Sequence, residues 1–169
     1  MTAICRSRRA LLRGDPTPTE TPLRPPWSVA KHRFTDACTR CGECLAACPE
    51  DILIHGDGGF PTVDFQRGEC SFCQDCVDAC PEPAFVDPAA HPPWQQTARI
   101  SDACLCQRGV VCQNCRDACP ESAIRFPPRL GGPALPVLDA SRCTGCGACV
   151  AICPSDAIGV HHHGPETRP

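Results

Sequence analysis

The feature that most limits the fold of this chain is a cysteine-rich unit that occurs four times. Each unit closes on a cysteine followed by proline, and these cysteines are Cys48, Cys80, Cys119 and Cys153. They lie 32, 39 and 34 residues apart, and a pair of apolar residues begins four positions after each of them. A repeat of this period indicates an array of similar small modules, each with the same local structure.

The spacing within a unit predicts that local structure. The last two cysteines of each unit enclose three residues, which suits one short helical turn. Proline ends this turn, because it has no N–H to continue the hydrogen-bond ladder. The apolar pair that follows begins a short strand, and we expect further strands at residues 61–64 and 136–139.

Three of the four cysteine groups share the spacing C-x2-C-x2-C-x3-C-P. They are Cys38, Cys41, Cys44 and Cys48; Cys70, Cys73, Cys76 and Cys80; and Cys143, Cys146, Cys149 and Cys153. Bacterial ferredoxins bind [4Fe–4S] clusters with this run of cysteines. Three cysteines at two-residue intervals let one loop hold three corners of a cubane, and the N–H groups of the loop then face its sulfurs. We therefore predict three [4Fe–4S] clusters at these groups.

The fourth ligand of each cluster comes from another group, because in two-cluster ferredoxins the cysteine before proline serves the other cluster. This crossing predicts four ligand sets. They are set I (Cys38, Cys41, Cys44, Cys80), set II (Cys70, Cys73, Cys76, Cys48), set III (Cys104, Cys112, Cys115, Cys153) and set IV (Cys143, Cys146, Cys149, Cys119).

The third group is irregular. Its last three positions are filled by Cys112, Cys115 and Cys119, but Gly109 stands where the first cysteine belongs. Cys104 and Cys106 lie further upstream, and a longer loop can bring one of them to the fourth corner. We expect Cys104 to bind a fourth [4Fe–4S] cluster and Cys106 to be spare. A three-iron cluster, or no cluster at this group, are the alternatives.

Zinc and disulfide bonds are the other uses of so many cysteines. Four-cysteine zinc sites have two close pairs separated by about a dozen residues or more, whereas here three cysteines fall within seven residues. Disulfide scaffolds are typical of secreted chains, but the apolar run Ala10-Leu11-Leu12 is too short for a secretory signal. No stretch approaches the roughly 18 apolar residues of a membrane span. We therefore expect a cytoplasmic chain with cluster-bound cysteines, and a free thiol at Cys5.

The composition gives the clusters a structural function as well. Among 169 residues there are 18 Cys but only 31 Leu, Ile, Val and Phe, which is below the usual share of about 20%. Small chains with so few core residues need a metal or disulfide staple. We predict an α+β fold of two tandem bacterial, two-cluster ferredoxin-like units, with short strands, helical turns and a cluster-stapled core.

The prolines and charges predict the boundaries of these units. The expected segments are a basic, Pro-rich, flexible arm at 1–35, a first unit with clusters I and II at 36–88, a linker at 89–97, a second unit with clusters III and IV at 98–161 and a flexible tail at 162–169. The first 33 residues carry seven Arg or Lys and two Asp or Glu. Because five prolines interrupt this stretch, we expect a peptide arm and no nucleic-acid partner.

Several segments outside the ferredoxin motifs resemble one family. They are Ser7-Arg8-Arg9, Arg24-Pro25-Pro26-Trp27-Ser28, Gly58-Gly59-Phe60-Pro61 and Asp102-Ala103-Cys104-Leu105. With the irregular third group, they make the chain similar to the NapF family, ferredoxin-type accessory proteins of the periplasmic nitrate reductase system. The resemblance implies that Cys104 is a ligand together with Cys112, Cys115 and Cys119, and that Cys106 lies outside the family pattern.

The resemblance also implies a function. A protein of this family is expected to contact the precursor of the catalytic molybdenum subunit of nitrate reductase and to help its maturation before export, by electron transfer or iron–sulfur supply. The residues that we predict to contact this partner are Arg8, Arg9, Arg24 and Trp27. The stretch Ser7–Arg13 also looks like a twin-arginine export motif without its apolar segment, although a plain basic arm is the alternative.

The sequence offers no phosphate-binding glycine loop and no flavin or nicotinamide fingerprint. We therefore expect an accessory or electron-transfer protein rather than an enzyme with its own substrate site. Two alternatives to the maturation function remain: a polyferredoxin that donates electrons to a reductase, and a cluster-stapled scaffold without a redox function.

Overall fold

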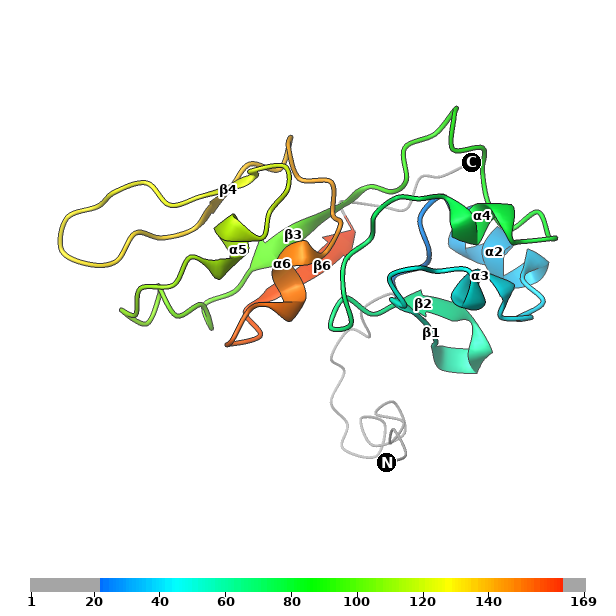
Figure 1. The fold of residues 1–169 in the computed structure, drawn as a ribbon, viewed down its shortest axis with the longest axis horizontal. Coiled ribbons are helices and arrows are strands. Elements are labelled where there is room, and N and C mark those ends of the chain that lie inside the picture. Colours follow the sequence, from blue (N-terminus) through cyan, green and yellow to red (C-terminus); the bar gives the residue numbers. More distant parts are fainter. Residues whose placement is uncertain (1–21, 163–169) are drawn as a thin grey trace.

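The computed structural model describes residues 22–162. The described part is longer in one direction, with the N-terminal half (residues 22–88) at one end and the C-terminal half (residues 96–162) at the other (Figure 1). Cys5, Arg8, Arg9 and the predicted tail beyond His162 lie outside the described residues.

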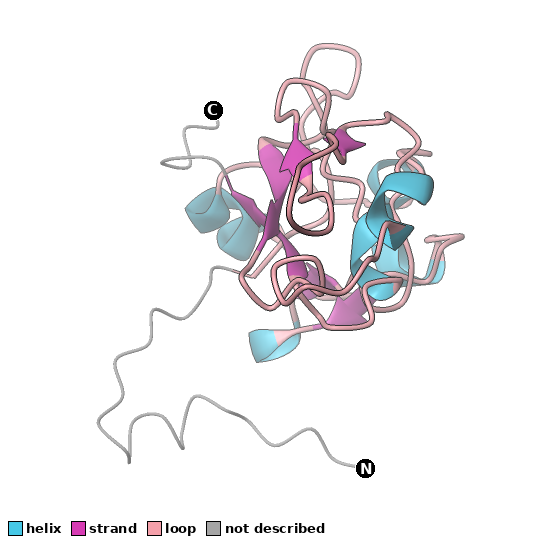
Figure 2. Ribbon diagram, turned by 90° about the vertical axis from the view of Figure 1, so that its left-hand side faces the viewer, coloured by secondary structure: helices cyan, strands magenta, loops and turns pink. Residues whose placement is uncertain are grey.

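Short elements with long connections make up both halves. In chain order they are α2 (Lys31–Ala37), α3 (Glu43–Ala46), β1 (Leu53–His55), the 3-10 helix η1 (Asp57–Gly59), β2 (Pro61–Val63), α4 (Asp75–Asp78), β3 (Gln96–Ile100), α5 (Asn114–Asp117), β4 (Ile124–Arg125), β5 (Val137–Leu138), α6 (Ala148–Ala151) and β6 (Ile158–His162). Figure 2 shows the strands in the middle of the molecule, with helices on either side. The architecture is a mixed α/β fold, as the sequence predicts.

The four helical turns lie in the four cysteine groups. Each of the helices α3, α4, α5 and α6 has four residues, and each carries one buried cysteine: Cys44, Cys76, Cys115 and Cys149. The expected helical turns are therefore confirmed. One turn of helix is far too short to be stable alone, so these turns depend on what their cysteines bind.

The strands form three antiparallel pairs. β1 pairs with β2, with Leu53 opposite Val63, and β4 pairs with β5, with Ile124 opposite Leu138. The longest pair joins β3 to β6 from Gln96 opposite His162 to Ile100 opposite Ile158. β1, β2, β4, β5 and β6 lie where strands were expected.

The strand expected at Ala84-Phe85 is absent from the described residues, where only an isolated bridge joins Ser28 to Phe85. The cause is the residue that stands three positions after the last cysteine of each group. Asp51, Ser122 and Asp156 occupy this position in the other groups, with φ of 53°, 48° and 49°. The second group has Pro83 there, and the proline ring fixes φ near −65°. The chain therefore leaves the second group along a different path.

The segment from Arg24 to Ala30 belongs to the fold, although the sequence places it in a flexible arm. Trp27 is 4% exposed, and its Nε1–H donates to the carbonyl of His91 at 3.0 Å. The guanidinium of Arg24 lies 5.4 Å from the ring centre of Phe34 and donates to a backbone carbonyl. A proline-rich sequence can be well ordered when aromatic rings cover it, since proline loses little entropy on folding.

The C-terminal half also extends further than expected. β3 begins at Gln96, inside the range predicted to be a linker, because Gln96 and Thr97 pair with His162 and His161. One apolar cluster runs through both halves and includes Ile52 and Phe65 from the first and Ile124 from the second. Within residues 22–162 no helix has the length and apolar character needed to cross a membrane.

Phe34 tests the core of the N-terminal half, because it is fully buried and packs edge-on against Phe85. We expect Phe34→Ala to lower the free energy of unfolding by about 3–5 kcal/mol, through lost burial and a residual cavity. Anaerobic urea unfolding of the iron-loaded protein, followed by circular dichroism, measures the effect. Leu130→Ala is the control, since Leu130 is 100% exposed and its truncation should change stability by less than about 0.5 kcal/mol. Equal stability of the two variants would contradict the assigned core.

Candidate metal centres

The crossing of the fourth cysteines is present in the folded chain. The four cysteines of set I line one cavity, those of set II line a second and those of set IV line a third. In each case three cysteines come from one group, and the fourth, which is Cys80, Cys48 or Cys119, comes from the neighbouring group. The structure therefore brings together the members of three sets in the predicted combinations.

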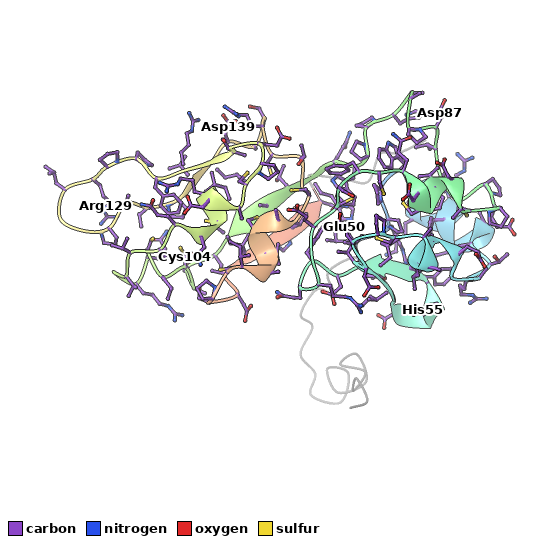
Figure 3. The ribbon with its side chains drawn as sticks, in the orientation of Figure 1. Glu50, His55, Asp87, Cys104, Arg129 and Asp139 are labelled. Atoms are coloured by element: carbon purple, nitrogen blue, oxygen red, sulfur yellow. The ribbon has the colours of Figure 1, made fainter. Side chains whose placement is uncertain are left out.

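Set III is assembled around Cys115. Burial and the nearby thiols of Cys104, Cys112 and Cys153 raise the pKa of Cys115 to about 11. The fourth member thus also comes from the neighbouring group. Figure 3 shows Cys104 in the same half of the molecule as α5 and α6.

Cys106, the other cysteine upstream of the third group, is differently placed. It is 3% exposed, and its thiol donates to the backbone carbonyl of Cys112 at 3.0 Å. This hydrogen bond gives Cys106 a structural partner. Cys104 as the ligand and Cys106 as the spare cysteine stay a prediction, which this hydrogen bond supports.

The loops of the regular groups have a shared backbone shape. The residue before the second cysteine is left-handed, as in Arg40, Phe72 and Gly145, and so is the residue after it, as in Gly42, Gln74 and Gly147. Alternation with left-handed residues makes a concave loop whose N–H groups face an anion. In the irregular third group the residue after Cys112 is Gln113, with φ of −136°. Its loop therefore has a different backbone conformation. The missing cysteine predicts an irregular loop but does not predict this conformation.

The buried thiols are costly to ionise in the absence of a cation. Burial, followed by the nearby cysteine thiols, raises the pKa of Cys44 to about 11 and that of Cys76 and Cys149 to about 12. A bound metal reverses this balance, because coordinated thiols lose their protons. A group of buried thiols of this kind therefore fits a metal-binding site.

The cavities lined by sets I, II and IV have a form that fits a cluster. Among residues 22–162, no three Cys, His, Asp or Glu side chains converge closely enough to hold a single metal ion. The thiols of a set instead surround a cavity, which also has apolar walls, such as Phe34 and Leu45 beside set I. A cubane has its four irons at separate corners, so its ligands are expected to stand apart in this way.

Backbone N–H groups donate to several of the sulfurs. Ala123 donates to Sγ of Cys119, and Ala157 donates to Sγ of Cys153, both at 3.3 Å. Ala98 donates to Sγ of Cys143 at 3.4 Å. Hydrogen bonds of this kind stabilise negative charge on sulfur and help to set the reduction potential of an iron–sulfur site.

The surroundings of the two pairs of sets differ in charge. Residues 36–88, which contain sets I and II, include eleven Asp or Glu and two Arg. Residues 98–161, which contain sets III and IV, include five Asp or Glu and six Arg. The first pair therefore lies in a strongly acidic segment and the second pair in one that is close to neutral.

Comparisons with known proteins agree with this arrangement. A 4Fe-4S dicluster domain matches residues 36–84 and again 108–157. The ferredoxin-type protein NapF of Escherichia coli K12 is 45% identical over 152 residues, which cover 90% of this chain and 92% of that protein. The chain belongs to the NapF family. NapF of Haemophilus influenzae is 49% identical over 136 residues, or 80% of this chain and 77% of its own length.

Family membership confirms the kind of cofactor: the chain is a ferredoxin-type protein with multiple [4Fe–4S] clusters. The likeness extends beyond NapF. The methylamine utilization ferredoxin-type protein MauM of Methylophilus methylotrophus is 31% identical over 172 residues, covering 90% of this chain and 75% of that protein. The ferredoxin architecture is thus shared more widely than any one function.

The roles of Cys104 and Cys106 can be separated by single substitutions. We expect about sixteen irons in the wild-type chain, four for each [4Fe–4S] cluster. Cys104→Ser should lower this to about twelve, whereas Cys106→Ser should keep about sixteen, because serine retains a donor to the Cys112 carbonyl. Iron and sulfide analysis after anaerobic purification measures both. Iron loss in Cys106→Ser alone would reverse the assignment.

Removal of iron should unfold the chain, since four-residue helices and two-stranded sheets are not stable by themselves. We expect an anaerobic chelator to remove iron together with the far-ultraviolet circular dichroism of the fold. Protease resistance should disappear in the same interval. A chain that keeps its dichroism after complete iron loss would show that the apolar core suffices.

Proposed function

We propose that the chain is a cytoplasmic accessory protein in the maturation of the catalytic molybdenum subunit of a periplasmic nitrate reductase. The observation that carries this proposal is the likeness to NapF over 90% of the chain, including the irregular third group. A likeness limited to the regular cysteine groups would suit any ferredoxin. The proposed action is on the precursor of that subunit, before its export.

Four [4Fe–4S] clusters, bound by sets I to IV, are part of the same proposal. The three cavities lined by sets I, II and IV support their assignment, and so does the position of Cys104 beside Cys115. When bound, the clusters supply one-electron chemistry. The protein would thus act by electron transfer or iron–sulfur supply, without a substrate site of its own.

The proposed contact with the precursor uses the N-terminal arm. Arg24 and Trp27, two of the residues predicted to touch the partner, pack within the chain on Phe34 and Phe72. Their contact with a partner stays a prediction. Arg8 and Arg9 lie outside the described residues, and we assign the partner contact to them first.

A deletion in the native host tests the maturation function. We expect the catalytic subunit to be present in the deletion strain but poorly active, and wild-type chain supplied in trans to restore its activity. The variant Arg8→Gln/Arg9→Gln should restore less and should co-purify less precursor. Arg6→Gln/Arg13→Gln is the matched control, because it removes the same charge from the same arm. Normal nitrate reductase activity in the deletion strain would overturn the proposal.

An electron carrier that feeds a reductase is the second candidate, and the exposure of Cys41 and Cys73 favours it, since it leaves ligands of sets I and II near the surface. The reduced, iron-loaded protein mixed with mature nitrate reductase and nitrate distinguishes the two. Rapid reoxidation that requires nitrate would support the carrier. Reoxidation that is equally slow with and without the reductase would leave maturation as the function.

A further inference from the structure

The two halves of the molecule meet through two cysteine loops. The backbone N–H of Cys70, a member of set II, donates to the carbonyl of Cys146, a member of set IV, at 2.8 Å. Two residues before Cys146, the carbonyl of Thr144 accepts a hydrogen bond from Nε1–H of Trp94, also at 2.8 Å. A loop of the N-terminal half is thus hydrogen-bonded directly to a loop of the C-terminal half.

Close packing holds these loops in place. A Cβ atom at Gly147 would collide with the ring of Phe65, and one at Gly145 would lie 2.6 Å from the carbonyl oxygen of Gln96. Trp94 packs edge-on against Phe65, with ring centres 6.0 Å apart, and against Phe72 at 5.6 Å. Only glycine therefore fits at these two positions of the set IV loop: Gly147 lies against Phe65 of the N-terminal half, and Gly145 lies against Gln96 of its own half.

We call the contact between the Cys70 loop and the Cys146 loop the junction. The hydrogen bond from the Cys70 N–H to the Cys146 carbonyl brings set II beside set IV there.

Within each half the sets are neighbours as well. Helix α3 contacts α4, and α5 contacts α6. Cys44 of set I lies on α3 and Cys76 of set II on α4, while Cys115 of set III lies on α5 and Cys149 of set IV on α6. Sets I and II are therefore adjacent, and so are sets III and IV.

We infer that the four ligand sets form one continuous row, in the order I, II, IV, III, which is joined at its centre where Cys70 meets Cys146. This rests on the proposed ligand sets. The two halves then carry one system of four neighbouring sites rather than two separate pairs. Sets I and III stand at the ends of the row, where different partners can each meet one end.

The chain offers a matched pair of glycines to test the junction. Gly147 and Gly42 follow the second cysteine of their groups, and both have φ of 87° and ψ of −2°. A Cβ at Gly42 meets only the side chain of His55, at 3.8 Å, whereas one at Gly147 meets the Phe65 ring. Alanine therefore strains both backbones alike but opens the junction only at Gly147.

The test compares iron-loaded, full-length wild type with Gly147→Ala and Gly42→Ala. In electron paramagnetic resonance of the reduced protein, neighbouring clusters broaden one another's signals. We expect Gly147→Ala to lose part of this broadening, and Gly42→Ala to keep all of it. Hydrogen exchange at the Cys70 N–H should become faster in Gly147→Ala alone. The double variant Phe65→Ala/Gly147→Ala, which makes room for the methyl group, should recover both properties in part.

Iron analysis separates the possible failures. Wild-type protein with too little iron for four clusters would count against the proposed ligand sets and hence against the row. Full iron, faster exchange at Cys70 and unchanged broadening in Gly147→Ala would overturn the row itself. Neither result depends on nitrate reductase, so failure of the maturation function is seen separately in the deletion strain.

A second variant covers the case in which Gly147→Ala loses iron. Trp94→Phe keeps an aromatic ring but removes the bond to Thr144, and it should decrease the broadening with iron unchanged. Trp27→Phe is its control, because it removes an equivalent indole bond, to the carbonyl of His91, and leaves the bond from Trp94 to Thr144 in place. Equal spectra for these two variants, with faster exchange at Cys70 in Trp94→Phe, would contradict the row.

Discussion

The last cysteine of each group lies beside three cysteines of the neighbouring group, and the proposed cluster sites depend on this exchange. Cys80 reaches back to the loop of Cys38 and Cys41, while Cys48 reaches forward to the second group. Each crossing ties together cysteines more than twenty residues apart in the sequence. We propose that clusters bound across these long closures supply what a larger apolar core would supply, since the one-turn helices and two-stranded sheets have little stability of their own.

The two halves have similar helical turns and strand pairs but differ at one strand pair. In the C-terminal half, β3 and β6 form an outer strand pair over five residue positions. The N-terminal half has a single bridge at Phe85 in the same place, and the buried segment with Trp27 covers that side. Pro83 excludes the left-handed residue that leads into a strand elsewhere, so aromatic packing takes over from strand pairing.

The cysteine repeat predicted the helical turns and the strands β1, β2, β4, β5 and β6, and its spacing predicts the crossed sets, because thiolates at fixed intervals leave few geometries around a cubane. It did not predict the burial of Trp27, since a proline-rich sequence looks the same whether or not rings cover it. The strand residues Gln96 and Thr97 depend on a partner strand more than sixty residues away. The junction at Gly147 was equally hidden, because the ring that requires glycine there comes from the other half of the chain.

The uneven charge of the chain is expected to make the reduction potentials of the iron–sulfur sites in its two halves unequal. Reduction adds negative charge, and this is harder among the eleven acidic residues of 36–88 than in 98–161, where arginines outnumber acids. At physiological salt, only charges within about 8 Å of a site act on it strongly. N–H bonds to Cys119, Cys143 and Cys153 ease reduction further in the C-terminal half. We therefore expect any clusters bound by the second half to have higher reduction potentials than those bound by the first.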